Sequence, residues 1–217
     1  MSAASFDAAI QFVLRWEGGY VDNPADHGGA TNRGITQRVY DAARAAQGMP
    51  VQDVRQIGDA EVMAIYRDGY WQPPRCDLLT PHLDLVQFDT AVNMGVKRAV
   101  AFLQGCVGCA PDGSFGDHTV QAVQQSSPAA VVASYCATRE QFYRTLAAQK
   151  PDQAVFLQGW LNRLDALRAA AAVPGFPVTR GGVDFGDSDH IAKVPDIGED
   201  PSVDRIFRQN SAQQSVE

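Results

Sequence analysis

Apolar residues recur every three or four positions along most of this chain, which is the spacing that places them on one face of an α-helix. Residues 83–94 differ because they are apolar almost all round, as is typical of a helix at the centre of a domain. Glycines and prolines separate the helical segments. The pattern predicts a mainly α protein with helices over residues 6–17, 83–94, 97–107 and 128–149, and with further helices that begin near Thr36, Asp59, Asp117 and Asp152.

The helix predicted over residues 6–17 has one unusual position. Its apolar face begins at Phe6, and Glu17 ends the same face just before a pair of glycines, while Ser5 is a candidate N-cap. Burial disfavours the ionised form of a carboxyl group, and a carboxyl that keeps its proton near neutral pH can act as a general acid. The alternative is a solvated glutamate at a helix end with no catalytic role.

The stretch after Glu17 is rich in turn-forming residues. Residues 22–24 and 27–29 have turn chemistry, and the short extended pieces around them predict a small β-hairpin beside the helix end. This layout places Asp26 and Thr31 across a groove from Glu17. Glycoside hydrolysis needs one protonated acid and a second polar group on the opposite face of the sugar. The candidate catalytic residues are therefore Glu17, Asp26 and Thr31.

Several motifs together resemble one enzyme family. Residues 17–20 read E-G-G-Y and residues 22–36 read D-N-P-A-D-H-G-G-A-T-N-R-G-I-T, which resembles the signature of glycoside hydrolase family 108, a family of N-acetylmuramidases. Residues 66–73 (Y-R-D-G-Y-W-Q-P) and 88–95 (F-D-T-A-V-N-M-G) resemble later helices of that family. Residues 96–125 contain L-Q-G-C-V-G and then D-G-S-F-G-D-H-T-V-Q-A-V, which resembles the L-Q…D-G-x-x-G-x-x-T-x-x-A-V pattern of predicted peptidoglycan-binding domains.

The resemblance implies a lysozyme-like helical fold, with the small β-hairpin next to the catalytic helix and Glu17 as the essential acid. The order Glu17, Asp26, Thr31 also resembles the Glu-Asp-Thr trio of phage-type lysozymes, although four residues separate Asp26 from Thr31 where the phage pattern has five. Asn93 lies in a motif similar to the phage-lysozyme helix whose asparagine faces the sugar cleft. We therefore expect Asn93 to bind substrate.

Other residues near these motifs have two interpretations each. Asp22 is the alternative second acid, but its side chain could instead brace the turn that follows it. Tyr20 could stack on a sugar ring or fill the core beside the glycines. Tyr70 could line the sugar groove or belong to the core. His27 lies in a turn and is expected to be idle.

Composition and charge narrow the class of protein. The chain has 217 residues, is 45% hydrophobic and has a net charge of −7, so it lacks the basic surface that nucleic acids need. No stretch approaches the roughly 18 apolar residues of a membrane span, and no Sec-type signal is recognisable at the start. We expect a monomer that is made in the cytoplasm, reaches the periplasm or cell wall by another route, and acts on peptidoglycan glycan strands.

The chain is predicted to have three parts. Residues 1–95 form a lysozyme-like catalytic region, and residues 96–173 form a helical, predicted peptidoglycan-binding region that packs on it. Residues 174–217 form an acidic extended tail with a net charge of −4. The tail has too little apolar material to offset its ordering entropy, so we expect it to serve delivery or a partner, such as a secretion component or an inhibitor protein. A phage endolysin and a secreted antibacterial effector both fit this organisation.

Two functions from other classes remain as alternatives. A zinc-dependent peptidoglycan amidase needs three ligands, and the four histidines are scattered without a ligand pair. A non-catalytic wall-binding adaptor would have no reason to keep the E-G-G-Y motif. Chitin is a related substrate. Cys106 and Cys109 form a lone C-x-x-C, which favours structural cysteines over a metal site, so no metal and no cofactor are predicted.

Overall fold

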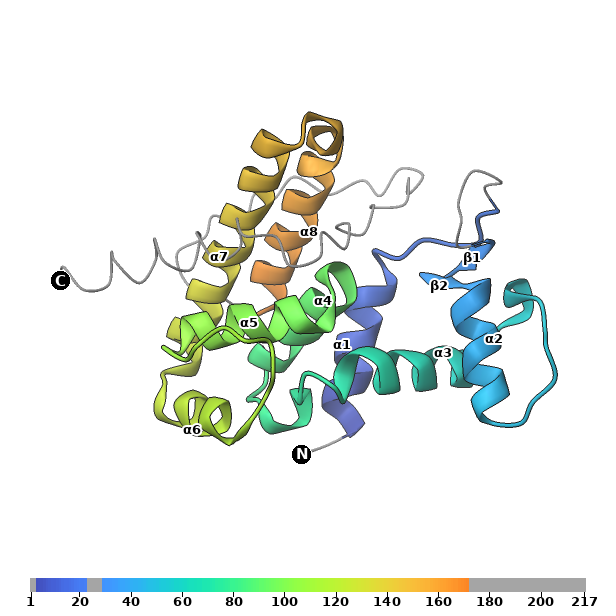
Figure 1. The fold of residues 1–217 in the computed structure, drawn as a ribbon, viewed down its shortest axis with the longest axis horizontal. Helices are drawn as coiled ribbons and strands as arrows, with labels where there is room; N and C mark the ends of the chain where they lie inside the picture. Colours follow the sequence, from blue (N-terminus) through green and yellow to red (C-terminus); the bar gives the residue numbers. More distant parts are fainter. Residues whose placement is uncertain (1–2, 23–28, 172–217) are drawn as a thin grey trace.

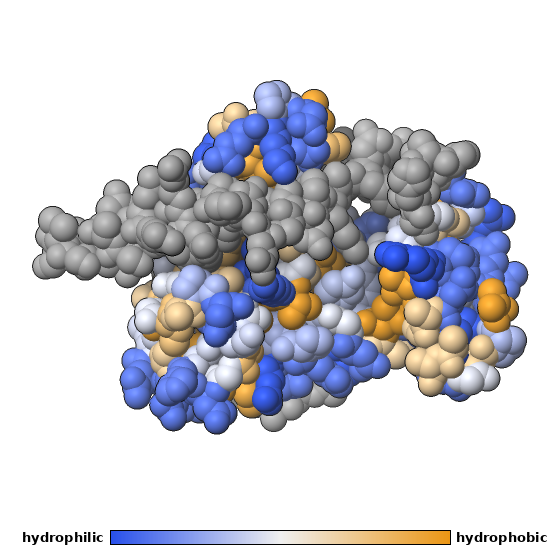
Figure 2. Space-filling model, in the orientation of Figure 1, coloured by the Kyte–Doolittle hydropathy of each residue, from blue (hydrophilic) through white to orange (hydrophobic). Residues whose placement is uncertain are grey.

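The computed structural model describes residues 3–22 and 29–171 of the chain. Within these ranges the chain forms eight α-helices and one two-stranded antiparallel sheet (Figure 1). The predicted fold, mainly α with a small β-hairpin, is confirmed. No helix in the described ranges is long and apolar enough to cross a membrane. On the part of the face in Figure 2 that described residues form, hydrophilic residues (blue) lie beside hydrophobic ones (orange).

The elements follow one another along the chain with short connections. The α-helices are α1 (Ala3–Leu14), α2 (Gln37–Ala46), α3 (Asp59–Tyr66), α4 (Leu83–Met94), α5 (Val96–Cys106), α6 (Asp117–Gln125), α7 (Pro128–Gln149) and α8 (Leu157–Ala170). Short helical turns are η1 (Val54–Gln56), η2 (Arg67–Trp71), η3 (Cys76–Leu78) and η4 (Pro151–Phe156). The strands are β1 (Thr31–Asn32) and β2 (Ile35–Thr36).

Helix α4 lies at the centre of the molecule, and its bounds match the predicted helix over residues 83–94. All of its residues except Leu85 are buried, because α1, α5 and α7 pack around it. Phe88 lies edge-on to the rings of Phe6 and Trp71, with ring centroids 5.7 and 5.4 Å apart. These contacts join α1, α4 and η2 in one hydrophobic core.

Helix α1 ends three residues before Glu17, so the helix predicted over residues 6–17 is wrong at both ends. The N-cap prediction for Ser5 is also wrong. Ser5 is already part of the helical segment, and its hydroxyl donates a hydrogen bond to the carboxylate of Asp84 on α4. At the other end the chain leaves the helix through a turn, and Gly18 takes a φ of +68°, which glycine adopts without a Cβ clash. Glu17 therefore lies in a turn.

The predicted β-hairpin is present, and a two-residue turn closes it. Thr31 pairs with Thr36, and Asn32 pairs with Ile35. The turn residues Arg33 and Gly34 both have positive φ, at 53° and 77°, which is the type I′ geometry that matches the twist of paired strands. Thr36 also caps α2 as predicted, because its hydroxyl accepts a hydrogen bond from the backbone N–H of Val39 at 3.3 Å.

Helices α5, α7 and α8 complete the helical body, with α7 and α8 side by side (Figure 1). Leu103, Phe142 and Trp160 belong to the same buried cluster as the residues of α1 and α4. The residues from 96 to 171 therefore share one hydrophobic core with the residues before them. The predicted tail, residues 174–217, lies outside the described residues.

A chain that ends at Gly95 is expected to lose cooperative folding. Helix α4 would then expose the apolar surface that α5 and α7 cover, and patches of that size are unstable in water. Thermal and urea unfolding, followed by circular dichroism, would measure this loss. The matched control is a chain that ends at Pro174, which keeps every described residue and should unfold cooperatively. A soluble 1–95 fragment with a cooperative transition would contradict the prediction.

Candidate active site

Glu17 is buried in the turn that follows α1, with only 5% of the residue exposed. Three other elements meet at its carboxylate. Helix α8 contributes Arg163, the β1–β2 turn contributes Gly34, and α3 contributes Tyr66. This position rules out the alternative of a solvated glutamate at a helix end.

The β1–β2 turn approaches the Glu17 carboxylate so closely that a side chain larger than that of glycine does not fit. A Cβ atom on Gly34 would lie 2.5 Å from Glu17 Oε2 and 2.5 Å from Tyr66 Oη. The Tyr66 hydroxyl donates to the backbone carbonyl of Arg33 at 2.8 Å, which ties the turn to α3. Burial, together with the nearby charge of Glu17, raises the pKa of Tyr66 well above its usual value, so this donor keeps its proton at neutral pH.

A chain of buried ion pairs connects Glu17 to the centre of the protein. Arg163 Nη1 lies 2.9 Å from Glu17 Oε1, and Arg163 Nη2 lies 2.8 Å from Asp89 Oδ1. The other oxygen of Asp89 accepts a hydrogen bond from Arg139 Nη1 at 2.6 Å. The side chains of Asp89, Arg139 and Arg163 are each at most 1% exposed. We call these four residues the ionic network.

The alternating charges of the ionic network offset the effect of burial on each member. Burial acts to raise the pKa of Asp89, but the guanidinium groups of Arg163 and Arg139 outweigh it and lower that pKa below its usual value. Burial acts to lower the pKa of Arg163, but Asp89 and Glu17 raise it, and the net change is upward. Asp89 and Arg163 therefore stay charged at neutral pH, and two carboxyl groups share one guanidinium.

Asn93 lies inside the protein beside the ionic network, with 1% of the residue exposed. Its Oδ1 accepts a hydrogen bond from the hydroxyl of Tyr143 on α7 at 2.7 Å. That hydroxyl in turn accepts from Arg139 Nε at 2.8 Å. The Asn93 amide nitrogen is buried and has no partner among the described residues. Buried amide donors generally have a hydrogen-bond partner. The substrate contact expected of Asn93 stays a prediction, and the amide nitrogen is the group that would make it.

The two candidate tyrosines lie nearer the surface and pack against the core. Arg55 Nη2 donates to Tyr20 Oη at 2.7 Å, and the Arg55 guanidinium carbon lies 4.3 Å from the Tyr20 ring centroid. Asp22 accepts a longer hydrogen bond from Tyr20, at 3.4 Å. Tyr70 lies against Tyr66, with ring centroids 5.8 Å apart. Contacts of either tyrosine with a sugar stay predictions.

Of the two predicted partners of Glu17, Thr31 lies in the described residues and Asp26 does not. Thr31 begins β1, and two backbone hydrogen bonds of 2.8 Å pair it with Val21. This pairing holds the described residues on either side of residues 23–28 together. Asp26 and His27 lie outside the described residues.

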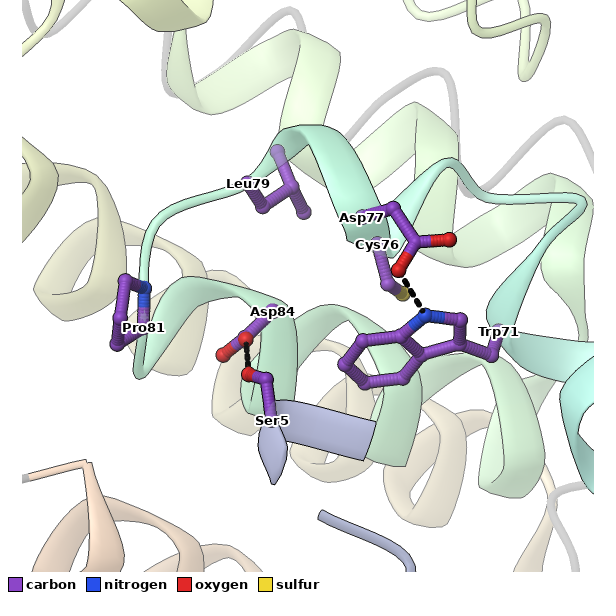
Figure 3. Close-up of a pocket in the computed structure, with 7 residues that line it drawn as sticks. All are labelled: Ser5, Trp71, Cys76, Asp77, Leu79, Pro81 and Asp84. Atoms are coloured by element: carbon purple, nitrogen blue, oxygen red, sulfur yellow. Dashed lines mark hydrogen bonds between the residues drawn. The ribbon is translucent and has the colours of Figure 1, made fainter. Parts of the chain in front are cut away.

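A separate hollow of about 200 Å³ lies beside the first turns of α1 (Figure 3). Its carboxylates already have partners, because Asp77 accepts from Trp71 Nε1 at 2.8 Å and Asp84 accepts from Ser5. None of the candidate site residues in the described ranges lines this hollow, so it is separate from the candidate active site at Glu17. The hollow is lined by Ser5, Trp71, Cys76, Asp77, Leu79, Pro81 and Asp84.

The cysteines are all free thiols, so Cys106 and Cys109 do not pair. Cys106 Sγ lies 3.9 Å from the hydroxyl of Thr138, and burial raises the pKa of the Cys106 thiol. Cys109 Sγ donates to the backbone carbonyl of His118 at 3.8 Å. Among the described residues, no group of three or more His, Cys, Asp or Glu side chains is arranged to hold a metal ion.

The partners of Glu17 were not predicted from the sequence. Arg163 interrupts the apolar face of the last helix one turn after Trp160, and Asp89 interrupts a helix that is otherwise apolar almost all round. Both residues carry the signal that identified Glu17, which is a charge at a position that the helical pattern buries. The same signal marks Arg139 on α7.

Comparisons with known proteins agree with the motifs. Residues 10–95 match a family model described as Glycosyl hydrolase 108, and residues 98–165 match one described as Predicted Peptidoglycan domain. The chain is also similar to the solved structure of Brucella abortus SagA, with 32% sequence identity and a TM-score of 0.66, over 81% of this chain and 99% of that chain. No curated protein sequence matches the chain. Glu17 and Asp89 fall in the first match and Arg163 in the second, so both regions contribute to the ionic network.

Replacement of Gly34 by alanine is expected to displace the Glu17 carboxylate, because the new methyl group would lie 2.5 Å from Glu17 Oε2. Misplacement of a catalytic group by about 1 Å lowers turnover on the order of 10²-fold. The strained backbone should also cost about 1–3 kcal/mol of unfolding free energy. Release of reducing ends from purified peptidoglycan and urea unfolding would measure the two effects.

Gly48→Ala is the matched control for this variant. Gly48 has a φ of +67°, similar to that of Gly34, but no atom lies within 4 Å of a Cβ atom placed on it. The control should lose stability through the same backbone strain and keep normal turnover. Equal losses of turnover in the two variants would contradict a specific role for the space beside Gly34.

Proposed function

The chain belongs to the glycosyl hydrolase 108 family, as its motifs predict, and from this membership we propose that it is a peptidoglycan hydrolase of the N-acetylmuramidase type. It cleaves the β-1,4 bond between N-acetylmuramic acid and N-acetylglucosamine, with Glu17 as the general acid. The observation that carries the proposal is the buried Glu17 carboxyl, which is held between a glycine turn and an arginine within family-matched residues. The match of residues 98–165 to a peptidoglycan domain supports the same polymer as substrate.

The proposed reaction starts with proton transfer from Glu17 to the glycosidic oxygen. That oxygen leaves as a hydroxyl group of N-acetylglucosamine when its bond to the anomeric carbon breaks. Positive charge develops at the anomeric carbon, and a second polar group on the opposite face of the sugar stabilises it or activates water. Water supplies the hydroxyl of the new reducing end, and its remaining proton restores the acid.

We assign the opposite face of the sugar to Asp26 and Thr31, with Asp22 as the alternative acid. The Val21–Thr31 pairing supports this assignment, because it brings the ends of the Asp26 segment to the hairpin whose turn touches Glu17. Tyr20 provides an aromatic ring on which a sugar can stack.

Mass spectrometry of the fragments released from purified peptidoglycan tests the proposed bond. A muramidase yields fragments that end in reducing N-acetylmuramic acid, whereas a glucosaminidase yields reducing N-acetylglucosamine. An amidase or peptidase frees or shortens stem peptides without new reducing ends. Binding to peptidoglycan without any released fragment would favour the non-catalytic adaptor, and a chitin assay in parallel would show how far the substrate range extends.

Activity is expected to persist in an excess of a metal chelator, because the proposed steps use only carboxyl groups and water. The measurement is the rate of reducing-end release before and after chelation, with zinc added back in a second arm. Loss of activity that zinc restores would replace this proposal with a zinc amidase or peptidase.

Glu17→Gln is expected to lower turnover by on the order of 10² to 10⁴-fold, because the amide cannot donate the proton of a general acid. Glutamine has the same shape and can still accept the hydrogen bond from Arg163, so the variant should stay folded. Asp26→Asn should also be severe, and Asp22→Asn should be milder. A folded Glu17→Gln variant with near-normal turnover would exclude Glu17 as the acid.

Glu61→Gln is the matched control for loss of a carboxylate that is paired with an arginine. Glu61 lies 2.5 Å from Arg44 Nη1 and accepts a hydrogen bond from the hydroxyl of Tyr40 at 2.7 Å. Its replacement should reduce stability and leave turnover unchanged, so it separates the loss of an ion pair from the loss of the acid.

A further inference from the structure

We propose that Arg163 is a positioning residue for the acid Glu17, and that Asp89 limits how much of the positive charge of Arg163 acts on Glu17. The inference rests on the proposed function, because it takes Glu17 to be the general acid. It places part of the active centre on α8, inside the region whose match is described only as a peptidoglycan domain.

The geometry of the Arg163 guanidinium group is the first argument. Its Nη1 donates to Glu17 Oε1 at 2.9 Å and its Nε donates to Asp89 Oδ1 at 2.9 Å. Its Nη2 lies 2.8 Å from the same Asp89 oxygen, in ion-pair contact but without hydrogen-bond geometry. A guanidinium group is planar and its donors have fixed directions. Asp89, on α4, is in turn paired with Arg139. Arg163 therefore fixes the position of Glu17, which lies in a turn, relative to α4 and α8.

The opposite side of Glu17 is fixed as well. The backbone at Gly34 leaves no room for a methyl group between Glu17 Oε2 and Tyr66 Oη. The carboxyl group is therefore bounded by the hairpin turn and α3 on one side and by Arg163 on the other. A reacting group that is fixed in this way contributes to catalysis through its orientation.

The arrangement of charges is the second argument. Among the described residues, the charged and titratable groups near Glu17 include Arg163 from α8 and Tyr66 from α3, with Asp89 from α4 behind Arg163. Arg33 in the hairpin turn acts on Tyr66. Arg33 forms its own ion pair with Asp59 at 2.6 Å. A guanidinium group favours the ionised form of any carboxyl it touches, which opposes the role of a proton donor. Asp89 takes two of the three contacts of Arg163 and thereby weakens this effect on Glu17.

The pH dependence of kcat/KM on purified peptidoglycan tests both halves of the proposal. In Arg163→Gln the alkaline limb, where the acid is ionised, should move to higher pH by about one unit, because a neighbouring positive charge is lost. In Asp89→Asn the same limb should move to lower pH, because Arg163 then acts on Glu17 alone. kcat of Arg163→Gln should also fall on the order of 10²-fold with little change in KM.

A purely structural role would lower the fraction of folded enzyme and would not move the two limbs in opposite directions. Arg163→Lys keeps the positive charge but loses the planar guanidinium group and its fixed donors. Its alkaline limb should therefore stay in place, while kcat falls to an intermediate value. Arg168→Gln is the matched control, because Arg168 is also buried on α8 but pairs with Glu140 and Asp165 at 2.8 and 3.0 Å. This control should keep the wild-type pH profile and kcat.

Each variant is assayed below its unfolding temperature, as measured by circular dichroism. If Arg163→Gln does not fold, the test uses Arg163→Lys and Asp89→Asn. A wild-type kcat in Arg163→Lys, or an alkaline limb that does not move in Asp89→Asn, overturns the inference. If the wild type is active and the folded variants have the same alkaline limb as the wild type, the inference is overturned and the proposed function stands. A wild type that releases no reducing ends removes the proposed function, and the inference falls with it.

Discussion

The guanidinium group of Arg163, buried between Glu17 and Asp89, is the interaction on which the rest of the site depends. Removal of one partner from a buried ion pair leaves an uncompensated charge, which costs about 3–5 kcal/mol. The alternation of Glu17, Arg163, Asp89 and Arg139 avoids this penalty because every charge meets an opposite one. The four residues come from the turn after α1 and from α8, α4 and α7, so these elements can form the site only when all of them are packed together.

The hairpin turn restricts the position of the Glu17 carboxyl group sterically, whereas Arg163 restricts it through charge. Arg33 adopts a left-handed conformation that non-glycine residues rarely take, and Gly34 follows with a φ of +77°. The turn thereby brings the backbone against Glu17, and the Tyr66 hydroxyl holds it there through the carbonyl of Arg33. Strained backbone of this kind persists only where the surrounding contacts enforce it, and it is frequent at functional sites.

Local signals in the sequence predicted the features that depend on near neighbours. The apolar character of residues 83–94 predicted the bounds of α4, and Thr36 predicted the start of α2 through its own hydroxyl. The two ends of α1 were not predictable, because a tertiary contact of Ser5 near its start and the turn before Gly18 after its end override the local helical pattern. The partner of Glu17 was not predictable from spacing either, since 146 residues separate it from Arg163. What the sequence does show is that each member of the ionic network is a charge at a position that the pattern buries.

That signal has a consequence for how the chain is divided. The two family matches meet between residues 95 and 98, at the junction of α4 and α5, yet Glu17 and Asp89 lie before this junction while Arg139 and Arg163 lie after it. If the two regions separated, two carboxylates and two guanidinium groups would each lose their partners, and the apolar surface of α4 would be exposed in the same step. Because both losses oppose separation, we expect the boundary between the matches to be a boundary of sequence families and not of folding units. The region described as a peptidoglycan domain therefore also contributes Arg163 to the candidate active site.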